Sequence, residues 1–420
     1  MKVRFFKSGL LKDSSLYGLT SIFEKSIPFF LLPILTRFLS TEDYGRVSMF
    51  LVLVGVVTPL VSLGVRGAIL RSFYKEEIDR ASYLTNSIYL IGFSSSILLF
   101  LFFCFKEFIA TNSGLTPFWV PIIVLVSLCQ ITINLLLVVW QAESKPLKHG
   151  GFKIAFSALN MALSIALIVW YGYNWEGRIG ALLISSASFA VFAIFLIIRE
   201  GFIKPKIVKK YIYHSLSFGV PLIPHLLSGT IIAMSDRFFI TNMIGLSETG
   251  IYAVGYQIGA IIEVLGISFR TAWVPWLYKQ LNSKNEKVKN KIVKFTYVYC
   301  VLIFLVALAV SFLAPWLMSF MIGDEFQGSM SFVIWVATGY SFKAMYYVIF
   351  NYVTYVEKTY LLSRLTLSIA VLNMIMNYFL IGKFGAIGAA QATTISYLFQ
   401  FLFVWLIASR VYKMPWFTFY

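Results

Sequence analysis

Apolar segments long enough to cross a lipid bilayer recur along the whole chain and leave no room for a soluble domain. A membrane-spanning helix needs about 20 predominantly apolar residues. We count about twelve such segments, with bounds near 15–39, 46–71, 82–105, 117–141, 151–171, 178–199, 215–244, 250–277, 295–317, 328–351, 360–382 and 386–409. The composition agrees, because 59% of the 420 residues are hydrophobic and only 13% are charged. We predict an all-α membrane protein, because helices satisfy their own backbone hydrogen bonds in lipid and the segments lack β-barrel alternation.

The distribution of lysine and arginine predicts the orientation of these segments. Basic residues gather in the N-terminal tail, in alternate loops such as Lys279–Lys294, and after the last segment. The intervening loops contain only Arg46, Lys106, Arg178 and Lys383. By the positive-inside rule, both termini are expected in the cytoplasm. The same bias explains most of the net charge of +17, so the charge indicates anionic lipid headgroups and not nucleic acid as partners.

The second half of the chain repeats the first. The matched stretches lie between roughly 200 and 213 residues apart: Thr36–Phe38 with Asp236–Phe238, Leu39–Gly45 with Leu246–Gly250, Asn160–Met161 with Asn373–Met374, and Gly177–Phe189 with Gly385–Tyr397. Each copy holds six segments, and an even number gives both copies the same orientation. We predict two parallel six-helix repeats, 1–205 and 206–420, related by an axis along the membrane normal.

Short motifs in this order resemble a known family. They are TRFLSTEDYG after the first segment, DRFFI in the seventh, and the Gly-x-x-Gly-Ala openings of segments six and twelve. The whole chain resembles the bacterial polysaccharide-biosynthesis flippases, which translocate lipid-linked oligosaccharides for O-antigen and capsule. They belong to the multidrug/oligosaccharidyl-lipid/polysaccharide exporter superfamily. The resemblance implies a MATE-like fold, with two six-helix lobes around a central cavity that opens alternately to the cytoplasm and the periplasm.

Ionisable residues within the segments indicate what such a cavity holds, because a charge at membrane depth is costly and normally faces a cavity or a partner. Helical rise places these groups at three depths. Near the cytoplasmic ends lie the repeat-equivalent Arg66 and Arg270; near the midplane lie the equivalent Lys25 and His225, with Lys343; near the periplasmic ends lie Arg37 and Arg237, with Asp236. The arginines could instead snorkel or pair with acids, Arg237 with Asp236 and Arg270 with Glu263, and His225 could be a satisfied core histidine.

The predicted interior is net positive and suits a pyrophosphate. Its acids are only Glu24, Asp236 and Glu263. Glu24, beside Lys25, is a candidate for coupling transport to H⁺ or Na⁺, or else pairs with a cation across the cleft. Polar residues that could contact a glycan, or form interhelical hydrogen bonds instead, are Gln130, Asn134, Asn160, Asn373, Asn377 and Gln391.

The expected function is therefore a flippase that translocates undecaprenyl-pyrophosphate-linked oligosaccharide, such as an O-antigen unit of lipopolysaccharide, across the inner membrane. Expected partners include polysaccharide polymerase and chain-length machinery, and no cofactor or metal is expected. A multidrug extruder of the same fold would need an acid-dominated cavity. A glycan polymerase or ligase would normally carry a large outer loop with catalytic groups, and the sequence shows no such loop and no catalytic motif. The cysteines, Cys104, Cys129 and Cys300, lack metal-ligand spacing.

Overall fold

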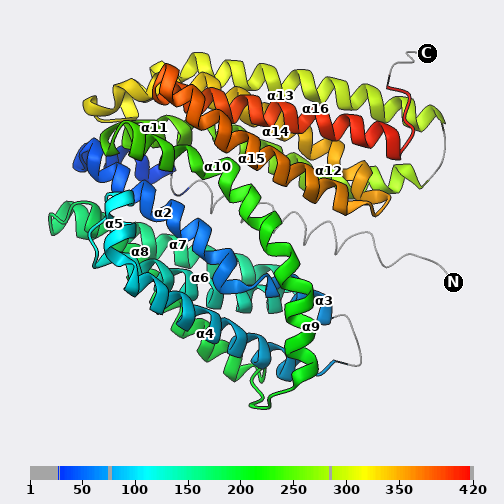
Figure 1. The fold of residues 1–420 in the computed structure, drawn as a ribbon. Helices are drawn as coiled ribbons and strands as arrows, with labels where there is room; N and C mark the ends of the chain where they lie inside the picture. The colour runs from blue at the N-terminus through cyan, green and yellow to red at the C-terminus, as the bar shows by residue number, and fades with distance from the viewer. Residues whose placement is uncertain (1–26, 28, 74–77, 283–285, 417–420) are drawn as a thin grey trace. The chain divides into compact units, whose positions relative to one another are not determined.

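The computed structural model describes residues 27, 29–73, 78–282 and 286–416, and throughout these residues every regular element is a helix (Figure 1). Among these described residues, eleven helical segments are long and apolar enough to cross a membrane. They coincide with predicted segments two to twelve, so the chain is a multi-pass helical membrane protein. A shorter apolar helix, Phe29–Phe38, lies in the first predicted segment, most of which falls outside the described residues.

The chain forms two compact units. Unit 1 comprises Arg46–Thr230 and the residues before Leu35, and unit 2 comprises Leu35–Gly45 and everything from Ile231 onward. The first helices are α2 (Thr41–Ser62), α3 (Val65–Ser72), α4 (Arg80–Cys104), α5 (Lys106–Ser113), α6 (Trp119–Ala142), α7 (Pro146–Ile165), η1 (Ala166–Trp170), α8 (Trp175–Arg199), α9 (Lys209–Gly219) and η2 (Val220–Leu222). The remaining helices are α10 (Ile223–Met243), α11 (Leu246–Gly259), α12 (Ile261–Leu281), α13 (Glu286–Met321), η3 (Asp324–Ser329), α14 (Met330–Tyr355), α15 (Thr359–Phe384) and α16 (Ala386–Val411).

One helix in each unit packs against most of the others. In unit 1, α6 contacts α3, α4, α7 and α8, and in unit 2, α14 contacts α11, α12, α13, α15 and α16 (Figure 1). Both helices are almost free of charge, because α6 contains no charged residue and α14 contains only Lys343. Helices that are apolar all round can be surrounded by other helices or by lipid, so tertiary packing decides which of them are central. These helices are predicted segments four and ten, so they hold equivalent places in the duplicated sequence.

The compact units and the predicted lobes divide the chain differently. The boundary between units falls inside α10, between Thr230 and Ile231, and a piece of the first repeat, Leu35–Gly45, belongs to unit 2. The predicted boundary at 205/206 concerns the two sequence repeats and stays a prediction. Below, each compact unit is described by itself.

The Leu35–Gly45 segment, which we call the elbow, is held in unit 2 by close contacts. A Cβ added at Gly45 would lie 2.1 Å from the carbonyl oxygen of Leu246, and one added at Gly250 would lie 1.9 Å from that of Thr41. The Thr41 and Ser247 hydroxyls are 2.7 Å apart. The contact is reciprocal, because Gly45 and Gly250 are equivalent residues of the two repeats. Glycine at both positions lets the two backbones approach this closely.

The basic stretch between α8 and α9 is fixed to the start of α4 in unit 1. Asn86 donates to the Lys206 carbonyl at 2.8 Å and accepts from the Val208 amide at 2.9 Å. The Lys204 ammonium lies 2.8 Å from Asp79 and, with Ser82, lowers the pKa of the Asp79 carboxyl to about 2. The residues predicted to link the two repeats are thus bound to unit 1.

Candidate functional site

An interruption of the second predicted segment positions Arg66. The helix stops at Ser62, and Leu63 and Gly64 both take the left-handed conformation, with φ of 48° and 66°. Glycine tolerates this conformation and leucine does so at a cost in strain. A Cβ on Gly64 would lie 2.4 Å from the Gly219 carbonyl oxygen at the end of α9, so close packing fixes the interruption. The chain restarts as α3, and Arg66 lies in its first turn.

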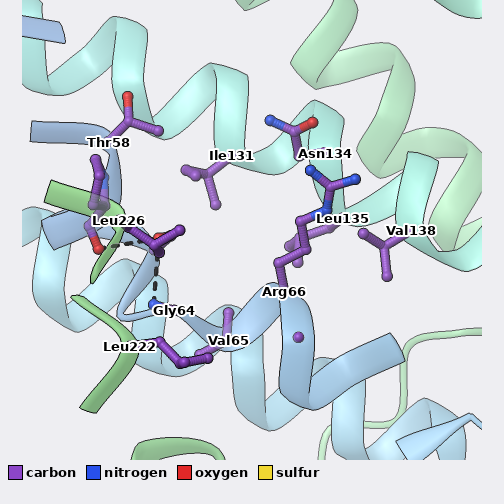
Figure 2. A pocket seen from close by; sticks show the side chains of 13 residues that line it. Thr58, Gly64, Val65, Arg66, Ile131, Asn134, Leu135, Val138, Leu222 and Leu226 are labelled. Carbon is purple, nitrogen blue, oxygen red and sulfur yellow. Dashed lines mark hydrogen bonds between the residues drawn. The ribbon is translucent and has the colours of Figure 1, made fainter. Parts of the chain in front are cut away.

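Arg66 lines a pocket within unit 1 of about 350 Å³ (Figure 2). The pocket is lined by Thr58, Pro59, Ser62, Gly64, Val65, Arg66, Gly67, Ile131, Asn134, Leu135, Val138, Leu222 and Leu226. In Figure 2 the Arg66 side chain extends from α3 toward Asn134 on α6. None of the described lining residues is acidic, and most are apolar. The pocket therefore combines one fixed cation and an amide with an apolar wall.

The pocket brings together two predicted candidates, Arg66 and Asn134. The first turn of α3 adds to their chemistry, because backbone N–H groups at a helix start lack intrahelical acceptors and favour anions. Pockets of this kind bind ligands that have both an apolar part and a polar group.

A second charged cluster lies in unit 2, around Lys343 of α14. The Lys343 ammonium is 2.7 Å from Glu263 Oε1 on α12 and 3.3 Å from the Tyr397 hydroxyl on α16. It also lies over the rings of Tyr340 and Tyr397, 4.9 Å and 5.0 Å from their centroids. The Tyr347 hydroxyl donates to the same Glu263 oxygen at 3.2 Å. Lys343 is therefore a cation with an acid partner inside an aromatic cage.

Arg270 does not pair with Glu263, which corrects the alternative drawn from their spacing of two helical turns. The Glu263 carboxylate forms an ion pair with Lys343 instead. The Arg270 guanidinium lies over the rings of Phe350 and Tyr347, 4.7 Å and 5.4 Å from their centroids. Tyr347 thus connects both predicted cations, since it contacts Arg270 and donates to the acid that holds Lys343. No described acid forms an ion pair with Arg270.

Asp236 and Arg237 of α10 pair with each other in the interior of unit 2. Their side chains are 3.2 Å apart, and Asp236 also accepts from Tyr252 and, at 2.8 Å, from the Arg237 backbone amide. The guanidinium donates to the Ala233 carbonyl and lies over Tyr256, 4.2 Å from the ring centroid. Both residues are buried. The sequence left open that Arg237 pairs with Asp236, and the structure has this local ion pair.

The remaining charged candidates are dispersed. His225 is exposed on α10, within unit 1. Arg37, in the elbow, is exposed and donates to the Phe320 carbonyl at 3.0 Å. Lys25 and Glu24 lie outside the described residues, so their proposed roles stay predictions.

Three of the polar candidates form interhelical hydrogen bonds. Asn160 donates to Ser185 at 2.9 Å, and its repeat equivalent Asn373 donates to Ser396 at 3.1 Å. Asn377 donates to Asn373 at 3.1 Å and to Ser235 at 3.3 Å. These amides join α7 to α8 and α10 to α15 and α16, a role that polar residues commonly have between membrane helices.

Gln130 on α6 and Gln391 on α16 are the last two polar candidates. Both are half-buried. Their proposed contact with a glycan stays a prediction.

Sequence reasoning missed the tyrosines around Lys343. Tyr340, Lys343 and Tyr347 are spaced by three and four residues, so they share one face of α14. This spacing could have identified Tyr340 and Tyr347 as neighbours of Lys343 from the sequence. Tyr397 of the cage comes from α16, and Tyr256, whose hydroxyl lies 2.7 Å from that of Tyr340, comes from α11; no local pattern connects either residue to α14.

Solved structures of other proteins share this fold. The chain has a TM-score of 0.76 and 16% identity to "Lipid II flippase MurJ, inward closed conformation", covering 93% of this chain and 87% of that one. It has a TM-score of 0.69 and 14% identity to an inward-facing multidrug resistance MATE family transporter of the MOP superfamily, covering 95% and 94%. The chain therefore has the fold of this class of helical membrane transporters.

The family follows from the sequence comparisons. A family model described as "Polysaccharide biosynthesis protein" matches residues 10–281, and one described as "MatE" matches residues 221–379. The chain is 26% identical over 363 residues to "Lsg locus putative protein 1" of Haemophilus influenzae, covering 84% of this chain and 87% of that protein. It is 23% identical over 394 residues to "Probable low-salt glycan biosynthesis flippase Agl15" of Haloferax volcanii, covering 92% and 81%. The chain belongs to the polysaccharide biosynthesis protein family, which confirms the predicted resemblance.

Proposed function

We propose that this protein is a flippase that moves an undecaprenyl-pyrophosphate-linked oligosaccharide, such as an O-antigen unit, from the cytoplasmic to the periplasmic leaflet of the bacterial inner membrane. Family membership supports the glycan part of the proposal, and the Haloferax relative is itself described as a glycan biosynthesis flippase. The fold shared with a lipid II flippase supports the lipid-linked part. Membrane lipids and the polysaccharide polymerase and chain-length machinery are the proposed partners.

The observation that carries the proposal is the Arg66 pocket. A lipid-linked pyrophosphate is an amphiphile with an anionic group next to an apolar chain. Arg66 and the first turn of α3 offer donors for the anion. Leucine, isoleucine and valine side chains from α6 and η2–α10 offer an apolar wall for the first part of the lipid. Asn134 gives an amide to the same pocket.

The charge balance favours an anionic substrate over the organic cations of a drug extruder. The acids Asp236 and Glu263 are each neutralised by a cation of unit 2. Arg66 and Arg270 form no ion pair with a described acid. An unpaired arginine at membrane depth is stabilised by an anionic ligand, and a cationic drug would be repelled.

Neutralising Arg66 or Arg270 is expected to reduce flipping by about 10- to 100-fold at limiting substrate, because each removes a charge-assisted hydrogen bond to the pyrophosphate. Arg66→Ala and Arg270→Ala are compared in proteoliposomes that contain a fluorescent undecaprenyl-pyrophosphate oligosaccharide. Arg71→Ala is the matched control, because Arg71 is on the same helix as Arg66, outside the pocket, and lies over Phe218. Wild-type flipping in a variant that lacks Arg66, Arg270, Lys343 and Lys25 together would exclude a role for these cations in binding the pyrophosphate.

The proposed orientation makes a separate prediction about accessibility. Cysteine at Thr116 or Glu325, exposed residues in predicted periplasmic loops, should react with an impermeant thiol reagent in intact cells. Cysteine at Ser144 or Lys206, exposed residues in predicted cytoplasmic loops, should react only after the cells are opened. Cys104, Cys129 and Cys300 are first replaced by alanine so that each new thiol is the single target. Labelling of Ser144→Cys from outside would reverse the orientation.

A further inference from the structure

The two ion pairs of unit 2 differ in how tightly they are held. Asp236 is fully buried, lies next to its partner in the sequence, and accepts hydrogen bonds from Arg237 and Tyr252. The Lys343 and Glu263 side chains instead keep 17% and 24% of their surface accessible, and they come from residues 80 positions apart. Asp236–Arg237 is therefore a buried ion pair with a structural role. Lys343–Glu263 keeps part of its surface accessible and joins two different helices, α14 and α12.

Lys343 is the only charged residue of the central helix α14. An ammonium at this place needs a counter-anion, because the cost of an unpaired charge in the membrane interior is several kcal/mol. Glu263 supplies that anion in the structure, with an N–O distance of 2.7 Å. A substrate phosphate would supply the same charge and the same acceptor atoms. Two anions therefore compete for one ammonium.

We propose that Glu263 is an internal counter-anion that the substrate's phosphate displaces from Lys343, and that Glu263 takes up one proton from water when it leaves the ion pair. This inference rests on the proposed function. It adds a second binding site to that function, a proton site at Glu263, and it assigns Glu263 a place in substrate release. When the phosphate leaves, Glu263 gives its proton back to water and binds Lys343 again.

The surroundings of the pair support a reversible exchange of this kind. The described groups around the pair include tyrosines on three helices: Tyr340 and Tyr347 on α14, Tyr397 on α16, and Tyr256 on α11, whose hydroxyl meets that of Tyr340. Arg270 on α12 contacts Tyr347, Tyr299 on α13 stacks on Phe269, and Asp236 and Arg237 on α10 lie beyond Tyr256.

No described acid other than Glu263 forms an ion pair with Lys343. The Tyr347 hydroxyl can stay hydrogen-bonded to Glu263 in either protonation state, because a hydroxyl both donates and accepts. Glu263 is thus the group whose charge changes when Lys343 changes partner.

Proton uptake also limits the charge that the interior must hold. Before exchange, Lys343 and Glu263 sum to zero. After exchange, a neutral Glu263 leaves the ammonium to offset part of the phosphate charge, whereas an ionised Glu263 would repel the phosphate. Substrate and proton therefore favour each other's binding, and the linkage is reciprocal. The affinity for a phosphate ligand should increase as the pH falls.

The experiment measures the binding of farnesyl pyrophosphate to purified protein in lipid nanodiscs by calorimetry in buffers of different ionisation enthalpy. Wild-type protein should take up about one proton more per ligand than Glu263→Gln. Glu263→Gln should also bind about tenfold more tightly or better, because the competing carboxylate is gone. Glu263→Asp should keep the proton uptake. Glu325→Gln, the same change at an exposed acid of unit 2, should match the wild type.

The possible outcomes separate the inference from the proposed function. If Glu263→Gln binds the probe with wild-type affinity and proton uptake, the competition is refuted and the flippase proposal stands. If wild type and all variants fail to bind the probe and to flip an undecaprenyl-pyrophosphate oligosaccharide, both are refuted. Should Glu263→Gln fold poorly, Glu263→Gln/Lys343→Met removes both charges. That variant should bind weakly and without the extra proton, and wild-type uptake in it would refute the inference.

Discussion

Replacing Asp236 by alanine is expected to lower the free energy of unfolding by about 3–5 kcal/mol, because the change leaves the Arg237 guanidinium buried without a counter-charge. Asp236 is 0% exposed and Arg237 8% exposed. The Tyr252 hydroxyl and the Arg237 amide would lose an acceptor in the same step. Thermal unfolding of the purified protein in one detergent measures the loss.

The control for this prediction removes both charges. Asp236→Leu/Arg237→Leu should recover much of the lost stability, since apolar residues of similar volume often replace a buried ion pair at little cost. Asp324→Ala, at an exposed acid of η3, should be near neutral. If the single and double changes at 236 and 237 melt at the same temperature, the uncompensated charge is not the cause of the loss.

Helix positions were predictable from the sequence because they depend on a local quantity, the length of an apolar run. The interruption at Leu63–Gly64 was not, although it places Arg66. Glycine also occurs within uninterrupted membrane helices, so Gly64 by itself does not mark a break in the sequence, and the break is packed closely against Gly219 of α9. A contact between residues this far apart is a tertiary effect, and no window of the sequence contains it.

The candidate site shows the same difference between features that depend on local sequence and features that depend on tertiary contacts. Counting along the helices predicted a midplane depth for Lys343, which stays a prediction, and the structure shows the residue facing other side chains, inside the tyrosine cage. The depth of a residue in the membrane does not determine which way its side chain points around the helix axis, or which helix packs beside it. The sequence therefore suggested Arg270 as the partner of Glu263 by proximity along α12, and the structure pairs Glu263 with Lys343 of α14.

Gly250→Ala is expected to destabilise unit 2 by about 3 kcal/mol or more, because the new methyl group would have to sit 1.9 Å from the Thr41 carbonyl oxygen. The obstacle is backbone, so no side-chain rotation can relieve it. Gly92→Ala is the matched control. Gly92 is also a helical glycine but has nothing within 4 Å of the added Cβ, so the change should be neutral or stabilise by up to about 1 kcal/mol.

The reciprocal geometry of the elbow adds a test that a single variant cannot give. Gly45→Ala should cost a similar amount, since its methyl group would meet the Leu246 carbonyl oxygen at 2.1 Å. Both changes push the same two backbones apart, so their combination should cost clearly less than the sum. Melting temperatures of the two single variants and the double variant, measured in the same detergent, give the coupling. Fully additive losses, or a Gly250→Ala shift equal to that of Gly92→Ala, would mean that the elbow and α11 are not packed at these glycines.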